Sequence, residues 1–344
     1  MPMRLGTLDT AAESPLAGLR ETLLREDFER YDETLVRVLE PQREYLTEIE
    51  MDLYRAGKKV RPMMLLLSAR ALHGTGPVPE KVIQGAVALE MLHVATLIHD
   101  DIIDEALVRR GMRSVNAARG IETAIIVGDM QFVQAIRSFV EGIDAQSDIG
   151  LVKMVLDVAF RICCGELDEL QTDPTSDLAE LRSRYLRTIE RKTAVMFGLA
   201  CEAGVKLVGG RTRDARRIGF FGRRIGRAFQ MMDDLLDLVQ DDEVSGKIRG
   251  MDLARRRLSL PLIYAMDELG PDHPVTCILH GADYTDDELD AGVRAVKRTE
   301  GFTRTYAEAR GEILDGLEYL RPFPRNRYRL ALEELALHVV DRGF

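Results

Sequence analysis

Three carboxylates lie close together near the end of a long apolar stretch, at Asp100, Asp101 and Asp104. Residues four apart on a helix share a face, so Asp100 and Asp104 project together with Asp101 beside them. Like charges in an apolar setting are costly unless a cation neutralises them. Because Mg²⁺ takes oxygen ligands and keeps room for substrate phosphates, the cluster predicts a magnesium site that receives a diphosphate.

The same spacing recurs downstream at Asp233, Asp234 and Asp237, again among apolar residues. A single acidic triple is most often a solvated helix face, but a second one of identical pattern in apolar surroundings makes coincidence a poor explanation. We therefore predict that the two clusters face each other across a cavity and hold Mg²⁺ bound to a diphosphate.

Basic residues flank both clusters. Arginine offers phosphate oxygens bidentate geometry and lysine offers a point charge, so the cations predict a second diphosphate that is bound directly. They are Lys58, Lys59, Arg61, Arg109, Arg110, Lys192 and Lys247. His93 lies two turns before Asp100 on nearly the same helix face and could reach the cavity, the alternative being an ordinary core histidine. We interpret His99 as structural.

The composition indicates helices. Of the 344 residues, 46% are hydrophobic but only 6% aromatic, so the apolar content is mainly Leu, Ile, Val, Met and Ala. No run alternates with a period of two, and we expect an all-α fold without strands. A flexible N-terminal tail is expected over residues 1–15. Because no linker rich in Pro, Gly or Ser divides the remainder, residues 16–344 are expected to form a single large domain.

Charge and cysteine content narrow the function classes. A net charge of -10 argues against nucleic acid as the partner. The N-terminus does not read as a signal peptide, and no stretch of about 18 charge-free apolar residues predicts a transmembrane segment. The four cysteines lack metal-ligand spacing, which fits a reducing compartment, and we expect a cytoplasmic protein.

Taken in order, these motifs resemble the all-trans polyprenyl diphosphate synthase family over about residues 20–344. The segments that carry the resemblance are Gly57–Pro62, Glu90–His93, His99–Asp104, Arg109–Gly111, Gly128–Asp129, Lys192–Thr193, Phe229–Gln230, Asp233–Asp237, Gly246–Lys247 and Leu260–Pro261.

The resemblance implies an all-helical fold around a deep central cavity, usually in a homodimer. It implies that isopentenyl diphosphate is condensed with an allylic diphosphate: the allylic substrate ionises to a carbocation, the isopentenyl double bond attacks it, and a proton is lost. Three Mg²⁺ ions would be held on the allylic diphosphate by Asp100, Asp101, Asp104, Asp233 and Asp237. Such a cation must be kept from water, so the rest of the cavity is expected to be dry and apolar.

The resemblance also assigns the remaining site residues. The allylic diphosphate would be contacted by Arg109, Lys192, Gln230, Lys247 and Arg257, and isopentenyl diphosphate by Lys58, Arg61, His93 and Arg110. Thr193 and Gln230 would offer dipoles to the carbocation, and the catalytic set would comprise Asp100, Asp101, Lys192, Thr193 and Gln230.

The chain departs from the family pattern at three places. Gln131 stands in a run that is usually apolar or aromatic, and Glu169 stands where Gln is usual. Arg256 and Arg257 replace a Gly-Lys pair. Each departure concerns substrate, product or rate more than fold.

Product length is expected to depend on a tunnel that runs back along the helix from Asp100. Its predicted lining is Ala95 and Thr96, then Met91 and Leu92, then Ala88, together with Phe132, and its floor candidates are Phe132, Ile136 and Phe139. Ala95 is small at a position where an aromatic residue would stop growth early. Each isoprene unit gains roughly 4 kcal/mol of apolar transfer, so a physical floor must end growth.

We predict an all-trans product of C30 to C40. The alternatives are a C20–C25 synthase, a class I terpene cyclase, and a non-catalytic subunit of a heteromeric synthase.

Overall fold

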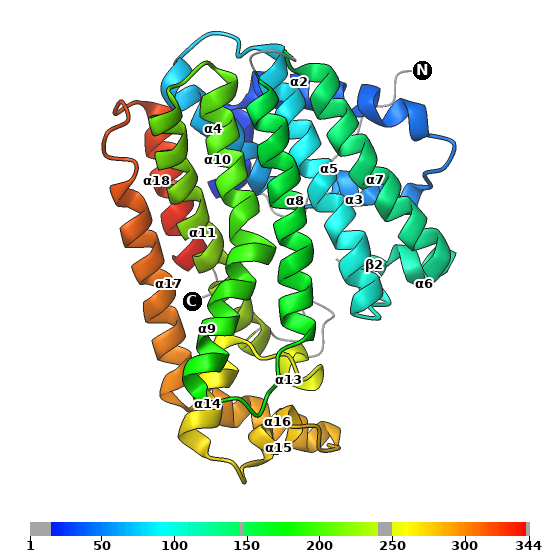
Figure 1. The fold of residues 1–344 in the computed structure, drawn as a ribbon, viewed down its shortest axis with the longest axis vertical. Helices are drawn as coiled ribbons and strands as arrows, with labels where there is room; N and C mark the ends of the chain where they lie inside the picture. Colours follow the sequence, from blue (N-terminus) through cyan, green and yellow to red (C-terminus); the bar gives the residue numbers. More distant parts are fainter. Residues whose placement is uncertain (1–14, 110, 145–147, 240–249, 342–344) are drawn as a thin grey trace. The chain divides into compact units, whose positions relative to one another are not determined.

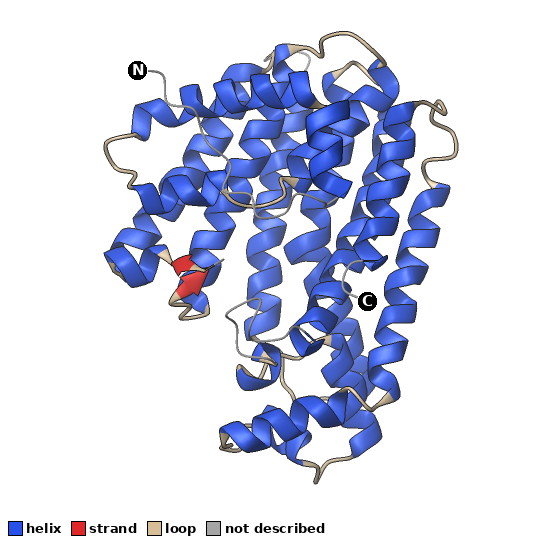
Figure 2. Ribbon diagram, turned by 180° about the vertical axis from the view of Figure 1, so that it is seen from behind, coloured by secondary structure: helices blue, strands red, loops and turns tan. Residues whose placement is uncertain are grey.

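Most of the described residues lie in helices, which confirms the all-α prediction (Figures 1 and 2). The computed structural model describes residues 15–109, 111–144, 148–239 and 250–341. The predicted tail therefore lies, apart from Pro15, outside the described residues.

The chain forms two compact units, each of which is described by itself. Unit 1 comprises residues 1–156, 199–219 and 322–335, and unit 2 comprises residues 157–198, 220–321 and 336–344. Four helices contribute residues to both units: α8 (Ile149–Leu170), α10 (Val195–Leu207), α11 (Thr212–Val239) and α18 (Arg327–Asp341). That residues 16–344 form a single domain stays a prediction.

Unit 1 holds the N-terminal helices. They are α1 (Pro15–Gly18), the π-helical turn η1 (Leu19–Leu23), α2 (Arg25–Leu39), the 3₁₀ turn η2 (Glu40–Gln42), α3 (Glu48–Arg55), α4 (Val60–His73), α5 (Glu80–Ile103), α6 (Val115–Arg119) and α7 (Ile121–Gly142). Local sequence sets several of their starts. Thr47 and Glu50 form a reciprocal capping box at α3, and Ser114 caps α6 through its side chain.

Unit 2 holds the middle of the chain and most of the C-terminal helices. They are α9 (Leu178–Ile189), the π-helical turn η3 (Glu190–Ala194), α13 (Met251–Ala254), α14 (Leu260–Leu269), α15 (Pro274–Leu279), α16 (Asp286–Val296) and α17 (Glu300–Glu318). Asp177 caps α9, and Thr285 with Glu288 forms a second capping box at α16.

Helix α5 is the core helix of unit 1, with α4 and α7 packed against it (Figure 1). It is long and apolar enough to cross a membrane, but 83% of its apolar window is buried inside the protein. A helix that is apolar on all sides is expected in the interior of a large protein. Its hydrophobicity therefore reflects core packing.

The expectation of no strands is wrong for one short segment after α5. Strands β1 (Val108–Arg109) and β2 (Met112–Arg113) form an antiparallel hairpin. Gly111 has φ of 77°, a conformation that suits glycine at a tight turn. Strands of two residues are too short to produce an alternating pattern, which is why periodicity could not reveal them.

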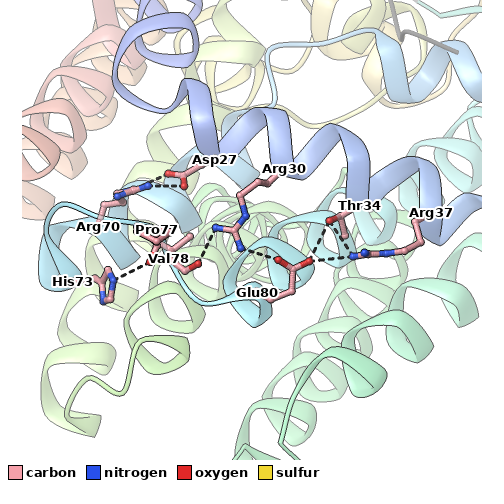
Figure 3. A network of polar contacts seen from close by, with 9 residues as sticks. All are labelled: Asp27, Arg30, Thr34, Arg37, Arg70, His73, Pro77, Val78 and Glu80. Atoms are coloured by element: carbon pink, nitrogen blue, oxygen red, sulfur yellow. Dashed lines mark hydrogen bonds and ion pairs between the residues drawn. The ribbon is translucent and has the colours of Figure 1, made fainter. Parts of the chain in front are cut away.

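A polar network fixes α2 to the end of α4, to the loop that follows and to the start of α5 (Figure 3). The guanidinium of Arg70 binds both carboxylate oxygens of buried Asp27, at 2.7 and 2.6 Å. Arg30 donates to the carbonyl of Val78 and, together with Arg37, to Glu80 at the start of α5. This clamp holds the N-terminal end of the core helix.

Candidate active site

The first carboxylate cluster lies at the C-terminal end of α5. Asp100 and Asp101 belong to its last turn, and Asp104 is its C-cap, with its backbone N–H 2.8 Å from the Asp100 carbonyl oxygen. A helix C-terminus carries partial negative charge, which adds to the three carboxylates. The local electrostatics therefore favour a cation here.

The hairpin brings one predicted cation onto this cluster. The Nε of Arg109 donates to Oδ1 of buried Asp101 at 2.7 Å. Asn116 in α6 donates to the carbonyls of Asp101 and Ala106, which ties the hairpin's exit to the helix end. Arg110, predicted to hold isopentenyl diphosphate, lies outside the described residues.

The loop before α4 and the first turn of that helix carry further predicted cations. Nη1 of Arg61 lies 3.0 Å from Nε2 of His93, so the structure brings these two predicted isopentenyl ligands together. Lys58 is exposed on the same loop. Lys59 differs: it is buried, has a left-handed backbone, and its Nζ contacts Oε1 of Glu90 at 2.9 Å. Lys59 therefore anchors the loop from the inside.

The second cluster lies near the C-terminal end of α11, in unit 2. A chain of hydrogen bonds runs from Thr193 to Gln230 (3.0 Å), from Gln230 to Asp234 (3.0 Å), and from Tyr185 to the other oxygen of Asp234 (2.6 Å). Burial, opposed by these hydrogen bonds and reinforced by Asp233, raises the pKa of Asp234 to about 7. Thr193 and Gln230, predicted to act together, are in contact.

Two acidic residues that the sequence analysis did not place in the site adjoin this cluster. The first is Asp252. Its burial and the nearby charges of Asp237 and Asp234 raise the pKa of its carboxyl well above the usual value. The other is Glu169, whose charge also raises the pKa of Asp234 and Asp252. Asp252 lies in a segment without apolar periodicity, so no pattern in the sequence singled it out.

The carboxylate of Asp237 accepts hydrogen bonds from the backbone N–H groups of Met251 (3.2 Å) and Asp252 (3.1 Å). It thus caps the short helix α13 and joins the end of α11 to the chain that follows. Lys247 lies between these two helices but outside the described residues.

Lys192 lies in the π-helical turn η3, between α9 and α10. Its Nζ contacts Oε2 of both Glu166 and Glu169, each at 2.8 Å. π-Helical turns are found disproportionately at functional sites.

Within the described residues, no three His, Cys, Asp or Glu side chains converge closely enough to chelate a metal ion by themselves. Each cluster instead offers separate oxygen ligands at a helix end. That donor set suits Mg²⁺, which usually takes one or two carboxylates, several waters and substrate phosphates. That the two clusters face each other stays a prediction, because each unit is described by itself.

Unit 1 contains a small apolar pocket beside α5. Its lining is almost entirely aliphatic and comes from α4, α5, α7, α8 and α10: Leu65, Gly85, Ala88, Leu89, Leu92, Ala135, Ile136, Phe139, Val155, Leu199 and Ala203. Leu92 lies eight residues before Asp100, about 12 Å along the helix axis. The pocket thus lies on the same helix as the first cluster.

Comparison with known proteins decides the family. The family model described as polyprenyl synthetase matches residues 43–291. The chain belongs to this family. It is a trans-prenyl diphosphate synthase, a prenyltransferase of isoprenoid biosynthesis.

Two comparisons cover nearly the whole chain of this polyprenyl synthetase. The "Heptaprenyl diphosphate synthase component 2" of Geobacillus stearothermophilus is 32% identical over 324 residues, which is 94% of this chain and 98% of the relative. The crystal structure of a decaprenyl diphosphate synthase from Rhodobacter capsulatus matches with a TM-score of 0.83 at 27% identity, covering 96% of this chain and all of that one.

A third comparison involves a structure with bound ligands. A polyprenyl synthase from Caulobacter crescentus, complexed with calcium and isoprenyl diphosphate, matches with a TM-score of 0.84 at 25% identity. The match covers 98% of this chain and all of the Caulobacter chain.

Two departures from the family pattern have a structural explanation. Gln131 is fully buried and faces polar partners: its Oε1 accepts from Tyr54 (2.6 Å) and Gln42 (3.2 Å), and its Nε2 donates to Gln42 (3.0 Å). It is not part of the pocket lining. Arg256 adopts φ of 57°, a left-handed backbone conformation that glycine adopts more readily than arginine.

The predicted tunnel residues occupy different places. Ala88 and Leu92 line the pocket, as do the floor candidates Ile136 and Phe139. Met91 and Ala95 are fully buried but do not line the pocket, while Thr96 and Phe132 are half-buried. Along α5 the pocket therefore begins about two turns before Asp100, and Ala95 lies between Asp100 and the pocket.

Proposed function

We propose that this synthase condenses isopentenyl diphosphate with an allylic diphosphate to make an all-trans C30–C40 polyprenyl diphosphate, with Mg²⁺ as cofactor. One observation supports this above all. The first carboxylate cluster closes the C-terminal end of α5, and an apolar pocket lies beside the same helix about two turns before it. The head group and the growing hydrocarbon would be bound by successive parts of one helix.

The ligand residues would fall into two groups, one for each diphosphate. Asp100, Asp101, Asp104, Asp233 and Asp237 would hold Mg²⁺, and bound Mg²⁺ would neutralise charge that develops on the leaving diphosphate. The Caulobacter synthase, whose crystal structure is a complex with calcium and isoprenyl diphosphate, supports a divalent-cation site in this family. Arg61 and His93 would contact isopentenyl diphosphate with Lys58 and Arg110.

The chemistry would begin with cleavage of the allylic C–O bond, the electron pair leaving with the diphosphate. The isopentenyl double bond would attack the resulting cation, and loss of a proton would give the new allylic product. Thr193 and Gln230, joined by a 3.0 Å hydrogen bond, would present dipoles to the cation. The aliphatic pocket would exclude water, which would otherwise quench the cation.

Product analysis tests this proposal directly. Purified enzyme is incubated with Mg²⁺, farnesyl diphosphate and isopentenyl diphosphate, and the chain length of the dephosphorylated products is measured. Products of C30–C40 are expected. Termination at C20 or C25 would replace the proposed length by the shorter alternative, and release of hydrocarbon from the allylic substrate alone would identify a terpene cyclase.

One observation favours a second candidate function. The Geobacillus relative is named as one component of a heptaprenyl diphosphate synthase, so this chain could be a subunit that needs a second component. Activity of the chain expressed alone, lost in Asp100→Ala, would exclude that candidate. Inactivity alone, with activity restored by a second polypeptide, would support it.

We further propose that the enzyme is a homodimer that associates through α7. Ile126, Val133 and Val140 lie seven residues apart on this helix and expose 65%, 62% and 46% of their surface. Apolar residues at seven-residue spacing form one stripe along a helix. Large exposed apolar patches mark interaction surfaces, and closed twofold dimers are the commonest oligomers. Location in the cytoplasm stays a prediction.

A further inference from the structure

Glu169 contacts Lys192, a residue that we place at the allylic diphosphate. Glu166 and Glu169 lie three apart on α8, so both project from one helix face. Each carboxylate contributes Oε2 to Nζ of Lys192 at 2.8 Å. The three side chains are only 16–32% exposed, so solvent screens this contact less than it would on an open surface.

Close backbone packing fixes Lys192 at this position. A Cβ on Gly165 of α8 would lie 2.6 Å from the backbone nitrogen of Lys192, so only glycine permits this approach. A Cβ on Gly226 of α11 would lie equally close to Cα of Ala194, in the same π-helical turn. The turn is thus packed between α8 and α11, and the Lys192 side chain starts from a fixed point beside Glu166 and Glu169.

Two carboxylates contact the ammonium of Lys192, so negative charge lies beside this lysine where a diphosphate is expected to bind. A glutamine at position 169 would still accept a hydrogen bond from Lys192, but hydrogen bonds to a charged acceptor are roughly twice as strong as neutral ones.

We propose that Glu169 restrains Lys192 and thereby weakens the binding of the allylic diphosphate in this enzyme. This inference rests on the proposed function, since Lys192 is placed at the allylic diphosphate there. A diphosphate that engages Lys192 must compete with the Glu169 carboxylate and is also repelled by it. Glu169 is thus a positioning residue that sets affinity for the head group without touching the reacting carbons.

The test compares Glu169→Gln with Asp168→Asn. Both variants remove one negative charge from the same part of α8, but Asp168 pairs with Arg191 (2.8 Å) instead of Lys192. We expect Glu169→Gln to raise kcat/KM for farnesyl diphosphate about three- to ten-fold, the change that weakening one charged hydrogen bond produces. The KM for isopentenyl diphosphate should stay within about two-fold, and Asp168→Asn should leave both parameters near wild type.

A binding measurement separates this inference from the proposed function. Calorimetry with inorganic diphosphate and Mg²⁺ needs no turnover, and Glu169→Gln should bind more tightly than wild type and Asp168→Asn. Unchanged or weaker binding in Glu169→Gln, or an equal gain in Asp168→Asn, would overturn the inference. A wild-type enzyme that binds diphosphate but forms no prenyl product would overturn the proposed function while leaving the affinity comparison intact.

Discussion

Lys59 and Glu90 form an ion pair of 2.9 Å inside unit 1, where their side chains are only 3% and 7% exposed. Nζ of Lys59 also donates to the carbonyl of Ala56 at 2.8 Å. Because Lys59 holds a left-handed backbone at the start of α4, this pair compensates a strained conformation between Lys58 in the loop and Arg61 in the first turn of the helix. The basic motif thus contains one structural lysine beside the cations predicted to bind substrate.

Breaking this pair should destabilise the protein strongly. Glu90→Leu leaves the Lys59 ammonium buried without its carboxylate and should lower the free energy of unfolding by about 3–5 kcal/mol. The double variant Lys59→Met/Glu90→Leu removes both charges and should recover most of that loss. Urea denaturation followed by circular dichroism measures both. A double variant no more stable than Glu90→Leu would contradict this account.

Removing the side-chain amide of Gln131 should also destabilise the protein, because its hydrogen bonds join α7 to α3 and η2. Gln131→Leu would leave the Tyr54 hydroxyl and the Gln42 amide buried without their partner, at about 1–3 kcal/mol for each group. Gln134→Leu is the matched control on α7, since Gln134 is only part-buried and donates one hydrogen bond, to the Val38 carbonyl. Equal losses of stability in the two variants would show that the buried network has no special role.

Spacing and composition in the sequence were enough to predict the helical fold. The family resemblance grouped Arg61 with His93 and Thr193 with Gln230, and the side chains of each pair lie 3.0 Å apart in the structure. The roles of these residues stay predictions. Each motif lies on or beside a long helix, where the period of 3.6 residues makes it possible to infer from the sequence which side chains share a face.

What the sequence did not reveal depends on non-local packing. Asp252 meets the second cluster only because Asp237 caps the helix that carries it. Gln131 is a polar residue in an otherwise apolar helix. Its hydrogen-bond partners, Tyr54 and Gln42, are 77 and 89 positions away in the sequence. The β1–β2 hairpin is too short for any period. Such contacts are set by how helices pack, which no local pattern encodes.

Filling the pocket should shorten the product. Ala88 lines it, and Ala88→Phe would occupy space that the growing chain is expected to enter, shifting products to shorter lengths. Ile136→Ala enlarges the same pocket and should shift them to longer ones. Ala95→Phe tests whether the route from Asp100 passes Ala95. Chain-length profiles unchanged by both Ala88→Phe and Ile136→Ala would show that the hydrocarbon grows elsewhere.

Removing the divalent cation should abolish turnover. With excess chelator we expect no product, and restored Mg²⁺ should restore the rate. Asp100→Asn and Asp233→Asn should each lower kcat by about 10²–10³-fold, the loss seen when one charge-stabilising group is removed from a reaction centre. Asp157→Asn, an exposed partner of Arg161 on α8, is the control and should keep full activity. Full activity in chelator would rule out the metal.

Dimerisation through α7 should fail when its stripe is charged. Val133→Glu places a carboxylate at the middle of the Ile126–Val133–Val140 stripe, so burying it against a second copy would carry a desolvation cost with no partner. Light scattering should then report a monomer where the wild type gives a dimer. Leu314→Glu, at an apolar position of α17 that is 56% exposed, should remain dimeric. If Leu314→Glu dissociates instead and Val133→Glu does not, the interface lies on α17, because each variant charges only its own face.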